Sequence, residues 1–397
     1  MPTPDVAEGF VGEDRRRELV EAARDFAQRE IAPHAAEWDE NREYPAHTIK
    51  RLGELGFLGL LVSEDMDGLG LDTLTYLMMV EEIAAADASV SIALSVHNSL
   101  PCCILELHGT AEQQERWLKP MARGELLAAF CVSEADAGSD LANVRARGEW
   151  NGSNWVLNGT KAWVTNGDVA DVLLVMVRTS DDASSRARGL SFFIVPSDTP
   201  GVAAGKAEDK MGLRASRTTQ IALTDVQLTA EHLVGEEGRG FGYAMEGLDA
   251  GRMSVAAQAI GIARSALEHA VKYAGERKQF EQPIKDFQGV SFMLADMATR
   301  LSAARALLHE AARAKQRGEG ITMQASMAKL FASEMAMFVT TRAVQVFGGY
   351  GYMRDYPVER LFRDAKVTEI YEGTSEVQRI VIARELYSDH DYRRDWT

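Results

Sequence analysis

A glutamate near the C-terminus, Glu372, is the residue of this sequence best suited to act as a base. It lies in the segment Tyr-Glu-Gly-Thr-Ser-Glu-Val-Gln, residues 371–378. Ser375 and Gln378 have the spacing of a capping box ahead of an apolar run, which predicts a helix starting at Glu376. Gly373 permits a sharp turn before that helix. Glu372 would then lie outside the helix, near free backbone N–H groups and the positive end of the dipole. The alternative is a solvated loop glutamate beside an ordinary helix cap.

Two other segments combine glycines with polar residues, 131–140 (Cys-Val-Ser-Glu-Ala-Asp-Ala-Gly-Ser-Asp) and 345–352 (Gln-Val-Phe-Gly-Gly-Tyr-Gly-Tyr). No dinucleotide-binding fingerprint follows a predicted strand, and the Gly-x-Gly triplets at 68–70 and 349–351 both lack its third glycine. The segment 201–206 resembles a P-loop, but it has one residue too few between its glycines and no Ser or Thr after its lysine. Rossmann and P-loop nucleotide sites are therefore not expected.

The composition predicts a soluble globular protein of two or three domains, with 397 residues and 46% hydrophobic content. A net charge of −16 and a pI near 5.1 argue against a nucleic-acid surface. Three cysteines and eight histidines show neither a disulfide framework nor metal-ligand spacing. Residues 1–17 contain four acidic residues and no apolar core segment, so they do not resemble a signal or transit peptide. A cytoplasmic location is therefore expected. The longest apolar stretch, Ser89 to Leu107, is interrupted by polar residues and a proline and fits a buried helix better than a membrane span.

The elements that must position these segments fall into three parts. Residues 1–124 have helical periodicity, as at Thr73 to Ala86. Residues 125–235 change to short apolar runs bounded by turn residues, which predict a compact β domain. Residues 236–397 contain four long helical segments, 243–277, 283–316, 321–347 and 376–387, which predict a helical bundle. The fold class is thus α+β and multidomain.

Three separated segments resemble the signatures of the acyl-CoA dehydrogenases: 131–140, 345–352 running on to Arg360 and Asp364, and 370–378. They occur in the family's order, and the similarity extends from about residue 14 to about residue 386. The resemblance implies a helical domain, a β-barrel-like middle domain, a C-terminal four-helix bundle, and FAD as cofactor. It also implies dehydrogenation of an acyl-CoA to the trans-2-enoyl-CoA. Glu372 would remove the α proton, the β hydride would pass to flavin N5, and the electrons would pass to an electron-transfer flavoprotein.

The resemblance assigns further residues to the flavin. Trp163, Val164 and Thr165 match positions that flank the isoalloxazine ring, although an aromatic beside a threonine is also an ordinary strand pair. Ala135 and Asp136 stand where the family commonly has Pro-Gly, which puts the local turn in doubt. The remaining flavin positions implied by the resemblance, including those that reach a cofactor held by a neighbouring subunit, are Phe130, Val132, Ser133, Gly138, Ser139, Arg277, Gln279, Phe280, Phe287, Gln288, Gln345, Val346, Gly348, Gly349, Thr374 and Glu376.

The substrate positions implied by the resemblance are Ser139, Leu248, Asp249, Arg252, Tyr371 and Gly373. Asp249 could instead favour a helix N-terminus through the dipole. Gly251 is informative because, in family members specialised for isovaleryl or long-chain substrates, the base lies on this helix. A glycine cannot serve as a base, so Glu372 must. The glycine usual after Phe280 is Glu281 here, so the turn at this point could differ.

The segments Glu208 to Arg214 and His97 to Leu100 look most like those of the short-chain, butyryl-type members. A homotetramer, a dimer of dimers, is expected as in the family. Three alternatives stay open: a dehydrogenase for branched short chains, an acyl-CoA oxidase that uses oxygen, and a non-catalytic flavin-binding relative. The expected partners are an acyl-CoA and the electron-transfer flavoprotein; neither nucleic acid, a membrane span nor a metal is expected.

Overall fold

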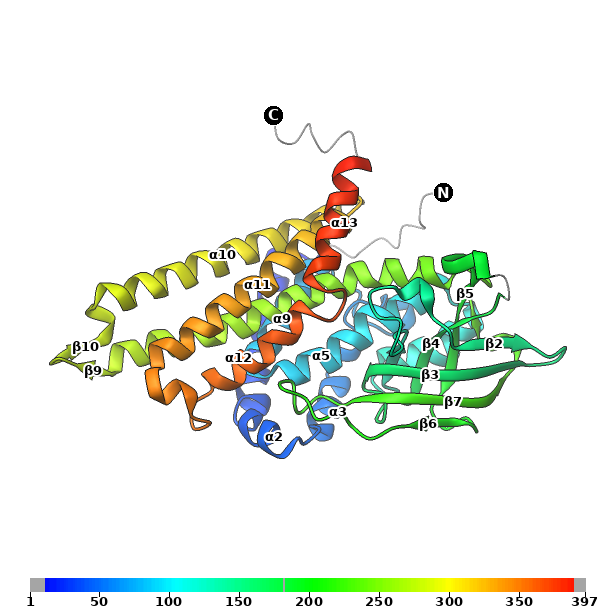
Figure 1. Ribbon diagram of the computed structural model, residues 1–397, viewed down its shortest axis with the longest axis horizontal. Coiled ribbons are helices and arrows are strands. Elements are labelled where there is room, and N and C mark those ends of the chain that lie inside the picture. The colour runs from blue at the N-terminus through cyan, green and yellow to red at the C-terminus, as the bar shows by residue number, and fades with distance from the viewer. Residues whose placement is uncertain (1–10, 181–182, 389–397) are drawn as a thin grey trace.

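The computed structural model describes residues 11–180 and 183–388. The predictions for residues 1–10 and 389–397 therefore lie outside the described residues. The chain forms a helical part, a β part and a second helical part in that order, as the sequence predicted (Figure 1). The β part lies at one end of the molecule, and the long C-terminal helices extend toward the other end (Figure 1).

The N-terminal part consists of short helices around two buried ones. Its helices are α1 (Glu13–Phe26), α2 (Ala35–Asn41), α3 (Ala46–Glu54), α4 (Thr73–Ala86), α5 (Ala88–His97), α6 (Cys103–His108), α7 (Ala111–Gln113) and α8 (Lys119–Ala122). α5 continues through a π-helical turn, Asn98–Cys102, into α6. The combined segment Ala88–His108 is long and apolar enough to cross a membrane, but 94% of its most apolar window is buried inside the fold. That burial is typical of a core helix, as expected for this stretch.

Aspartates fix the starts of the two buried helices. The Asp72 carboxylate accepts from the backbone N of Thr75 at 2.7 Å and caps α4. The Asp87 carboxylate accepts from the backbone N atoms of Ser89 and Val90 at 2.8 and 2.9 Å and caps α5. Asp87 itself is extended, with φ −155°, so it ends α4 and starts α5 in one step.

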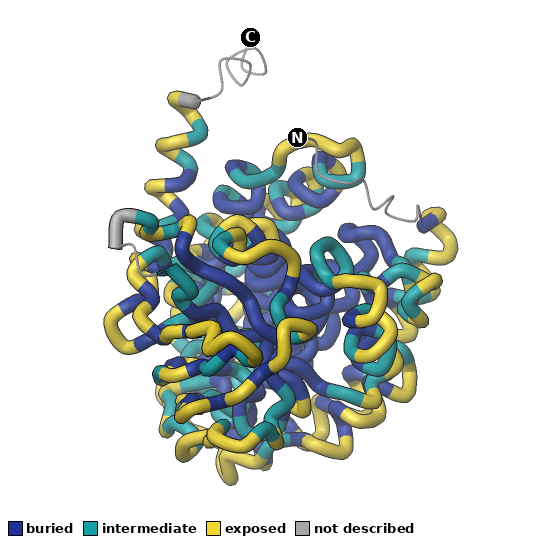
Figure 2. Tube along the Cα trace, turned by 90° about the vertical axis from the view of Figure 1, so that its right-hand side faces the viewer, coloured by how far each residue is buried: buried dark blue, intermediate teal, exposed yellow. Residues whose placement is uncertain are grey.

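The middle part is one mixed sheet of eight strands. They are β1 (Ala128–Cys131), β2 (Arg147–Trp150), β3 (Trp155–Thr165), β4 (Val172–Arg178), β5 (Leu190–Pro196), β6 (Val202–Ala204), β7 (Thr218–Leu228) and β8 (Leu233–Val234). Their order is β6-β7-β3-β2-β4-β5-β8, and β1 pairs with β4 in parallel. β4 and β5 are almost wholly buried, as their continuous apolar sequences require, and buried chain runs through the interior of this part (Figure 2).

The C-terminal part is built on three long helices, α9 (Gly240–Glu276), α10 (Gln288–Gln316) and α11 (Thr322–Phe347). α10 begins five residues later than predicted, because Pro283 belongs to a small hairpin of β9 (Lys278–Gln279) and β10 (Gln282–Pro283) and Ile284–Asp286 form a 3₁₀ turn. α12 (Val358–Lys366) packs against α11 and α9. The fourth predicted helix is α13 (Ser375–Ser388), which packs on α11 at its start and then projects from the body of the molecule (Figures 1 and 2).

Buried polar contacts join the N-terminal helical part to the β part. The His97 ring at the end of α5 lies 3.2 Å from the carbonyl oxygen of Met121, and its Nδ1 accepts from the backbone N of Ala128 at 3.0 Å. Asn166, directly after β3, donates to the carbonyl oxygen of Ala93 in α5 at 3.1 Å. The end of β3 is thereby tied to the helical core.

Candidate active site

Glu372 lies in a short loop between the 3₁₀ turn Val367–Glu369 and α13. Glu372 and Gly373 have consecutive left-handed conformations, with φ 54° and 87°. A glycine adopts this conformation readily, whereas a glutamate does so only at a cost in strain. Glu372 is therefore outside the helix, as predicted, and its backbone is held in an uncommon conformation.

The helix cap differs from the predicted one. The Thr374 hydroxyl accepts from the backbone N of Val377 at 3.3 Å, and the carbonyl of Thr374 accepts from the backbone N of Gln378 at 2.9 Å. The capping residue is therefore Thr374, one position earlier than predicted, and the Ser375 hydroxyl is buried without a hydrogen-bond partner among the described residues. Gln378 does not complete a capping box, because its amide serves the Glu372 loop instead.

Three buried side chains from other elements hold this loop. The Gln378 side chain donates to the carbonyl oxygens of Glu372 and Gly373 at 3.0 and 2.9 Å. Lys329, on α11, donates to the same Gly373 oxygen at 2.7 Å. On the other side the Tyr371 hydroxyl donates to the side-chain oxygen of Gln258, whose amide donates to the carbonyl oxygen of Ala88 at 2.8 Å. The loop is thus fixed on α9, α11 and α13.

The Glu372 carboxylate is directed at the bare backbone of α9. A Cβ atom built on Gly251 would lie 2.7 Å from Glu372 Oε2 and 3.5 Å from Cδ2 of Leu100. Oε2 is inaccessible to solvent and has no hydrogen-bond partner among the described residues. Burial raises the pKa of Glu372 to about 7, although the positive charges of Arg252 and Lys329 oppose the shift. A carboxylate with a free oxygen and a pKa near neutrality can take up a proton from a ligand.

Asp249 and Arg252 form an ion pair on either side of Gly251, with Arg252 buried and Asp249 half-buried. Arg252 donates to Asp249 Oδ1 at 2.5 Å, and the Thr322 hydroxyl donates to Asp249 Oδ2 at 2.7 Å. α9 begins at Gly240, so Asp249 lies more than two turns inside the helix and does not act on the helix N-terminus. That alternative is wrong. Leu248 is half-buried beside the pair.

The predicted flavin residues of β3 lie at a β-bulge. The pairing of β3 with β7 shifts register between Lys161 and Val164, and Trp163 takes φ 61° within that shift. A bulge redirects a side chain, and the indole of Trp163 is 64% exposed. Thr165 is half-buried at the end of the strand, whereas the Val164 side chain is buried in the sheet core, so Val164 can offer a ligand only its backbone.

The segment after β1 lies beside this bulge. The Ser133 carbonyl accepts from the backbone N of Ala162 at 2.9 Å, and Lys161 donates to the carbonyl of Val132 and to the Glu134 carboxylate at 3.2 and 2.7 Å. Phe130 is half-buried, and Gly138 and Ser139 are exposed in the loop that follows.

The doubtful turn at Ala135 and Asp136 is well formed. Glu134 and Ala137 exchange two backbone hydrogen bonds at 3.1 Å around these residues. The Glu134 carboxylate also accepts from the backbone N atoms of Arg145 and Ala146 at 2.8 and 2.9 Å. The turn therefore forms without Pro-Gly.

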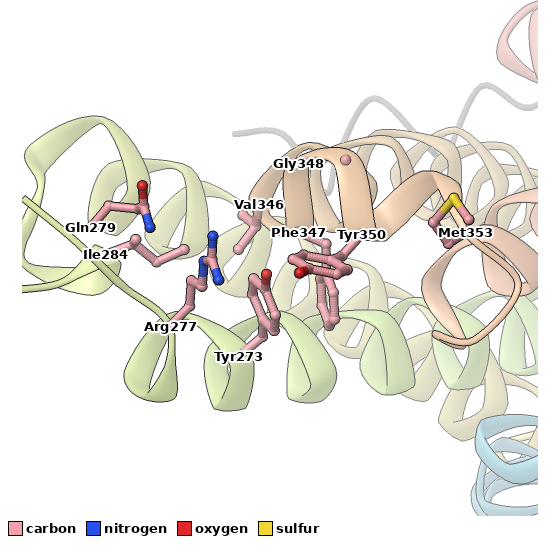
Figure 3. A pocket seen from close by; sticks show the side chains of 10 residues that line it. Tyr273, Arg277, Gln279, Ile284, Val346, Phe347, Gly348, Tyr350 and Met353 are labelled. Atoms are coloured by element: carbon pink, nitrogen blue, oxygen red, sulfur yellow. The ribbon is translucent and has the colours of Figure 1, made fainter.

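The third group of predicted residues surrounds an open hollow of about 550 Å³ at the β9–β10 hairpin (Figure 3). Arg277, Gln279, Val346, Gly348 and Gly349 line it, as expected for residues of one site. The Arg277 guanidinium lies 5.5 Å from the ring centre of Tyr350. Five lining residues were not predicted as site residues: Tyr273, Ile284, Phe347, Tyr350 and Met353.

The other predicted residues of this group do not line the hollow. Phe280 is 88% exposed at the tip of the hairpin, its ring 6.0 Å from that of Phe287. Gln288, at the start of α10, and Gln345, on α11, are exposed. Phe280 and Glu281 both have left-handed backbones, with φ 50° and 65°, so the tight turn persists although Glu281 replaces the expected glycine.

The structure puts the predicted residues in three places rather than one. The Glu372 loop lies against α9 near Asp249 and Arg252, the Trp163 bulge lies on β3, and the hollow lies at the far end of α9 from the β part (Figure 1). The hollow is about 39 Å along the helix from Gly251.

Sequence reasoning missed Lys329 and Gln258, and it gave Gln378 a different role. Each is fully buried and holds the Glu372 loop. Lys329 carried a signal that could have been used, because it is a lone lysine in the apolar run Met327 to Phe331, on the same face of α11 as the buried Ala325 and Ala332.

Comparison with known proteins agrees with this geometry. Models of the N-terminal, middle and C-terminal domains of acyl-CoA dehydrogenases match residues 13–125, 129–226 and 238–387. The short-chain specific acyl-CoA dehydrogenase of Clostridium acetobutylicum is 43% identical over 374 residues, which cover 94% of this chain and 98% of that protein.

Solved structures agree as well. The butyryl-CoA dehydrogenase of Megasphaera elsdenii is similar with a TM-score of 0.93 at 43% identity, covering 96% of this chain and all of the other. A chain solved in work on the electron transferring flavoprotein of Acidaminococcus fermentans has a TM-score of 0.93 at 44% identity, with coverage of 96% and 99%.

Proposed function

Because this chain belongs to the acyl-CoA dehydrogenase family of FAD-dependent oxidoreductases, we propose that it converts short-chain acyl-CoA thioesters to trans-2-enoyl-CoA with Glu372 as the base. The observation that carries the proposal is the Glu372 carboxylate, buried against Gly251 with one oxygen that has no hydrogen-bond partner in the part of the chain that the structure describes. An unpartnered buried acceptor costs stability, and removal of an α proton is the task that would use it.

Residues of this chain are proposed to carry out separate parts of the reaction. The Glu372 carboxylate takes the α proton, and its backbone N–H donates to the thioester oxygen as negative charge develops there. Tyr371 and Gly373 flank the base and line the acyl end of the site. When bound, the flavin supplies the two-electron acceptor for the β hydride.

The residues present fit a flavin dinucleotide. Trp163 offers an exposed aromatic surface beside the half-buried Thr165 and the segment at Ser133, which suits a planar ring system. Arg277 offers a planar guanidinium at an open hollow, which suits a diphosphate. Thr374 and Glu376, at the start of α13, would approach the cofactor from the side of the base.

The separation of these two places supports a shared site. The end of β3, which carries the Trp163 bulge, is tied to α5 in the helical core, whereas the Arg277 hollow lies beside the β9–β10 hairpin at the far end of the C-terminal helices (Figure 1). One flavin is therefore proposed to bridge two subunits of a homotetramer. Phe280, Phe287, Gln288 and Gln345 are proposed to contact the cofactor from this neighbouring subunit. The exposure of Phe280 and Gln345 leaves both available for such a contact.

The CoA moiety is proposed to run past Leu248 and the Asp249–Arg252 pair toward Ser139. Asp249 is already satisfied by Arg252 and Thr322, so it acts by orienting the guanidinium. Arg252 Nε is buried with no partner among the described residues, which leaves a donor for the ligand.

The acyl pocket is proposed to be short. The predicted far wall, α5, presents the buried Val90, Ile92, Leu94 and Val96, and Leu100 Cδ2 lies 3.5 Å from the Cβ position of Gly251. A further buried methylene gains about 0.8 kcal/mol, whereas forcing a chain against a packed wall costs about 1 to 3 kcal/mol. We expect kcat/KM to peak at about four to six carbons and then to decline steeply. A series from butyryl- to palmitoyl-CoA, with branched acyl groups included, measures this, and an optimum at octanoyl-CoA or longer would contradict it.

Substitution of the base tests the whole proposal. Glu372→Gln keeps the size and hydrogen bonding of the side chain, so FAD and acyl-CoA should still bind while turnover falls at least about a hundredfold. Glu319→Gln, which changes an exposed glutamate between α10 and α11, is the matched control. The assignment fails if the Glu372 variant keeps more than about a tenth of wild-type turnover.

The electron acceptor is proposed to be an electron-transfer flavoprotein in the cytoplasm. The similarity to a chain solved in work on such a flavoprotein supports this choice. Oxygen consumption that matches substrate turnover without any other acceptor would instead identify an oxidase.

A further inference from the structure

Lys329 is a fully buried cation in the middle of α11. Its ammonium group donates to the carbonyl oxygen of Gly373 at 2.7 Å, directly after Glu372. Burying an ammonium group is costly, and an apolar side chain of similar length would fill the same space at less cost. The position therefore needs an explanation beyond packing.

The hydrogen bond alone does not supply that explanation. The same Gly373 oxygen also accepts from the Gln378 amide at 2.9 Å, and the amide additionally holds the Glu372 carbonyl at 3.0 Å. The loop therefore keeps a donor at both carbonyls without Lys329. What Lys329 adds is a positive charge.

Charged groups from four elements face the Glu372 site. α9 supplies Arg252, α11 supplies Lys329, and the exposed Glu376 of α13 and Glu369 of the preceding turn act on Lys329 from outside. Arg252 is already paired with Asp249 at 2.5 Å, so much of its charge is compensated. Lys329 has no such ion pair among the described residues, and its ammonium group is held at the carbonyl of Gly373, the residue next to the base.

The titration of the two groups agrees with this geometry. Burial lowers the pKa of Lys329 to about 8, and the Glu372 charge opposes that shift. Burial raises the pKa of Glu372 to about 7, and the Lys329 charge opposes that one. Each group thus favours the charged form of the other.

We propose that Lys329 is a positioning residue whose charge keeps the Glu372 carboxylate ionised and directed at Gly251 before substrate arrives. This inference rests on the proposed role of Glu372 as the base. The lysine does not touch the reacting atoms, and it acts through the carboxylate and the loop that carries it.

Two variants separate the charge from the hydrogen bond. Lys329→Met removes both at similar length, and Lys329→Gln removes the charge but keeps an amide donor. In the FAD-loaded enzyme with butyryl-CoA and a dye acceptor, the rising limb of kcat/KM against pH should move upward by about one unit in both variants. Activity above about pH 9 should recover to within a few-fold of wild type. Lys272→Met, which removes an exposed lysine of α9, should leave the limb in place.

A purely structural role gives a different pattern. Lys329→Gln would then keep the wild-type midpoint, and Lys329→Met would lose activity equally at every pH. That result would overturn the proposal. FAD content and thermal melting identify a variant that fails to fold; if Lys329→Met does so, Lys329→Gln decides.

A direct titration separates this inference from the proposed function. Infrared difference spectra of the ligand-free holoenzyme, with Glu372→Gln as the blank, follow protonation of the Glu372 carboxyl without turnover. A raised midpoint in the Lys329 variants supports the inference even if the enzyme fails to oxidise butyryl-CoA. An unchanged midpoint refutes it even if the enzyme oxidises butyryl-CoA rapidly.

Discussion

The Glu372 side chain can act as a base near neutral pH because the fold buries it without neutralising it. A carboxyl group in water has a pKa well below neutrality, so its carboxylate is too weak a base to compete for an α proton. Burial beside Gly251 raises its pKa to about 7, and Arg252 and Lys329 prevent a larger rise. Burial disfavours the ionised carboxylate, and the two cations favour it. These three effects together set the pKa of Glu372 and so the pH at which it can act as a base.

The pH dependence of catalysis follows with a definite sign. Only ionised Glu372 can accept the α proton, so kcat/KM should increase about tenfold per pH unit below about pH 7 and level off above it. Because the folded pKa lies above the ordinary value of 4.5, Glu372 also contributes stability that is present at low pH and lost as the pH rises through about 7. Steady-state assays with a pH-insensitive acceptor measure this increase of kcat/KM with pH. A plateau that already begins below pH 5 would contradict the assignment of Glu372 as the base.

Contact between α9 and the Glu372 loop depends on one missing side chain. In Gly251→Ala the new methyl carbon would lie 2.7 Å from Glu372 Oε2, closer than side chains tolerate, so the carboxylate must move. We expect kcat to fall by about tenfold or more, with FAD content and melting temperature nearly unchanged. Gly275→Ala on the same helix is the control, because no atom of residues 11–180 or 183–388 outside its own surroundings in the helix lies within 4 Å of its Cβ position. Equal kcat values for the two variants would show that the carboxylate is not held as described.

Local sequence signals predicted the elements better than their ends. The strand residues Trp155 to Leu157 and the helix 73–86 lie within β3 and α4, because their patterns depend only on near neighbours. The N-cap of α13 was predicted one residue too late, because Ser and Thr are both preferred at this position. The fold buries the Ser375 hydroxyl, and the Thr374 hydroxyl accepts from the first turn of the helix instead. The predicted start of α10 was too early, because Pro283 belongs to the hairpin and Ile284–Asp286 form a 3₁₀ turn before the helix.

The functional site was predictable only in part, because sequence patterns depend on near neighbours along the chain. Glu372 and Gly251 could be paired through family resemblance, and the structure puts them in contact. Lys329 lies 44 residues from Gly373, and nothing in its own segment indicates that partner. Such long-range contacts are set by how α9, α11 and α13 pack, which periodicity does not specify.

The assembled protein should need its neighbours to keep the cofactor. If Arg277 binds the diphosphate of a flavin held mainly by another subunit, Arg277→Ala should release FAD and weaken the tetramer together. Lys278→Ala, an exposed cation at the next position, should do neither. Size-exclusion chromatography with the flavin-to-protein absorbance ratio measures both effects. A wild-type monomer with a full complement of flavin would refute the shared site.

The β part and the C-terminal helices meet through a backbone contact that leaves no room for a methyl group. A Cβ atom on Gly212 would lie 2.4 Å from the carbonyl oxygen of Arg363, and the neighbouring Leu213 N donates to the Asp364 carboxylate at 2.6 Å. Gly212→Ala should therefore separate the two parts, lowering the melting temperature by about 3 °C or more and reducing turnover. Gly205→Ala, with its nearest atom at 3.5 Å, is the control. Equal melting temperatures would show that the contact is easily relaxed.

The close approach of Glu372 to Gly251 also restricts how this enzyme could change during evolution. Relatives that carry the base on the equivalent of α9 need a glutamate at 251, yet even a methyl group there collides with Oε2 of Glu372. A lineage leaving the present arrangement must therefore displace or shorten the side chain of residue 372 before a base at 251 is in place, or change both positions at once. The intermediate sequences between the two base locations would have low activity. We therefore expect each base location to be retained among relatives that have come to act on different acyl chains.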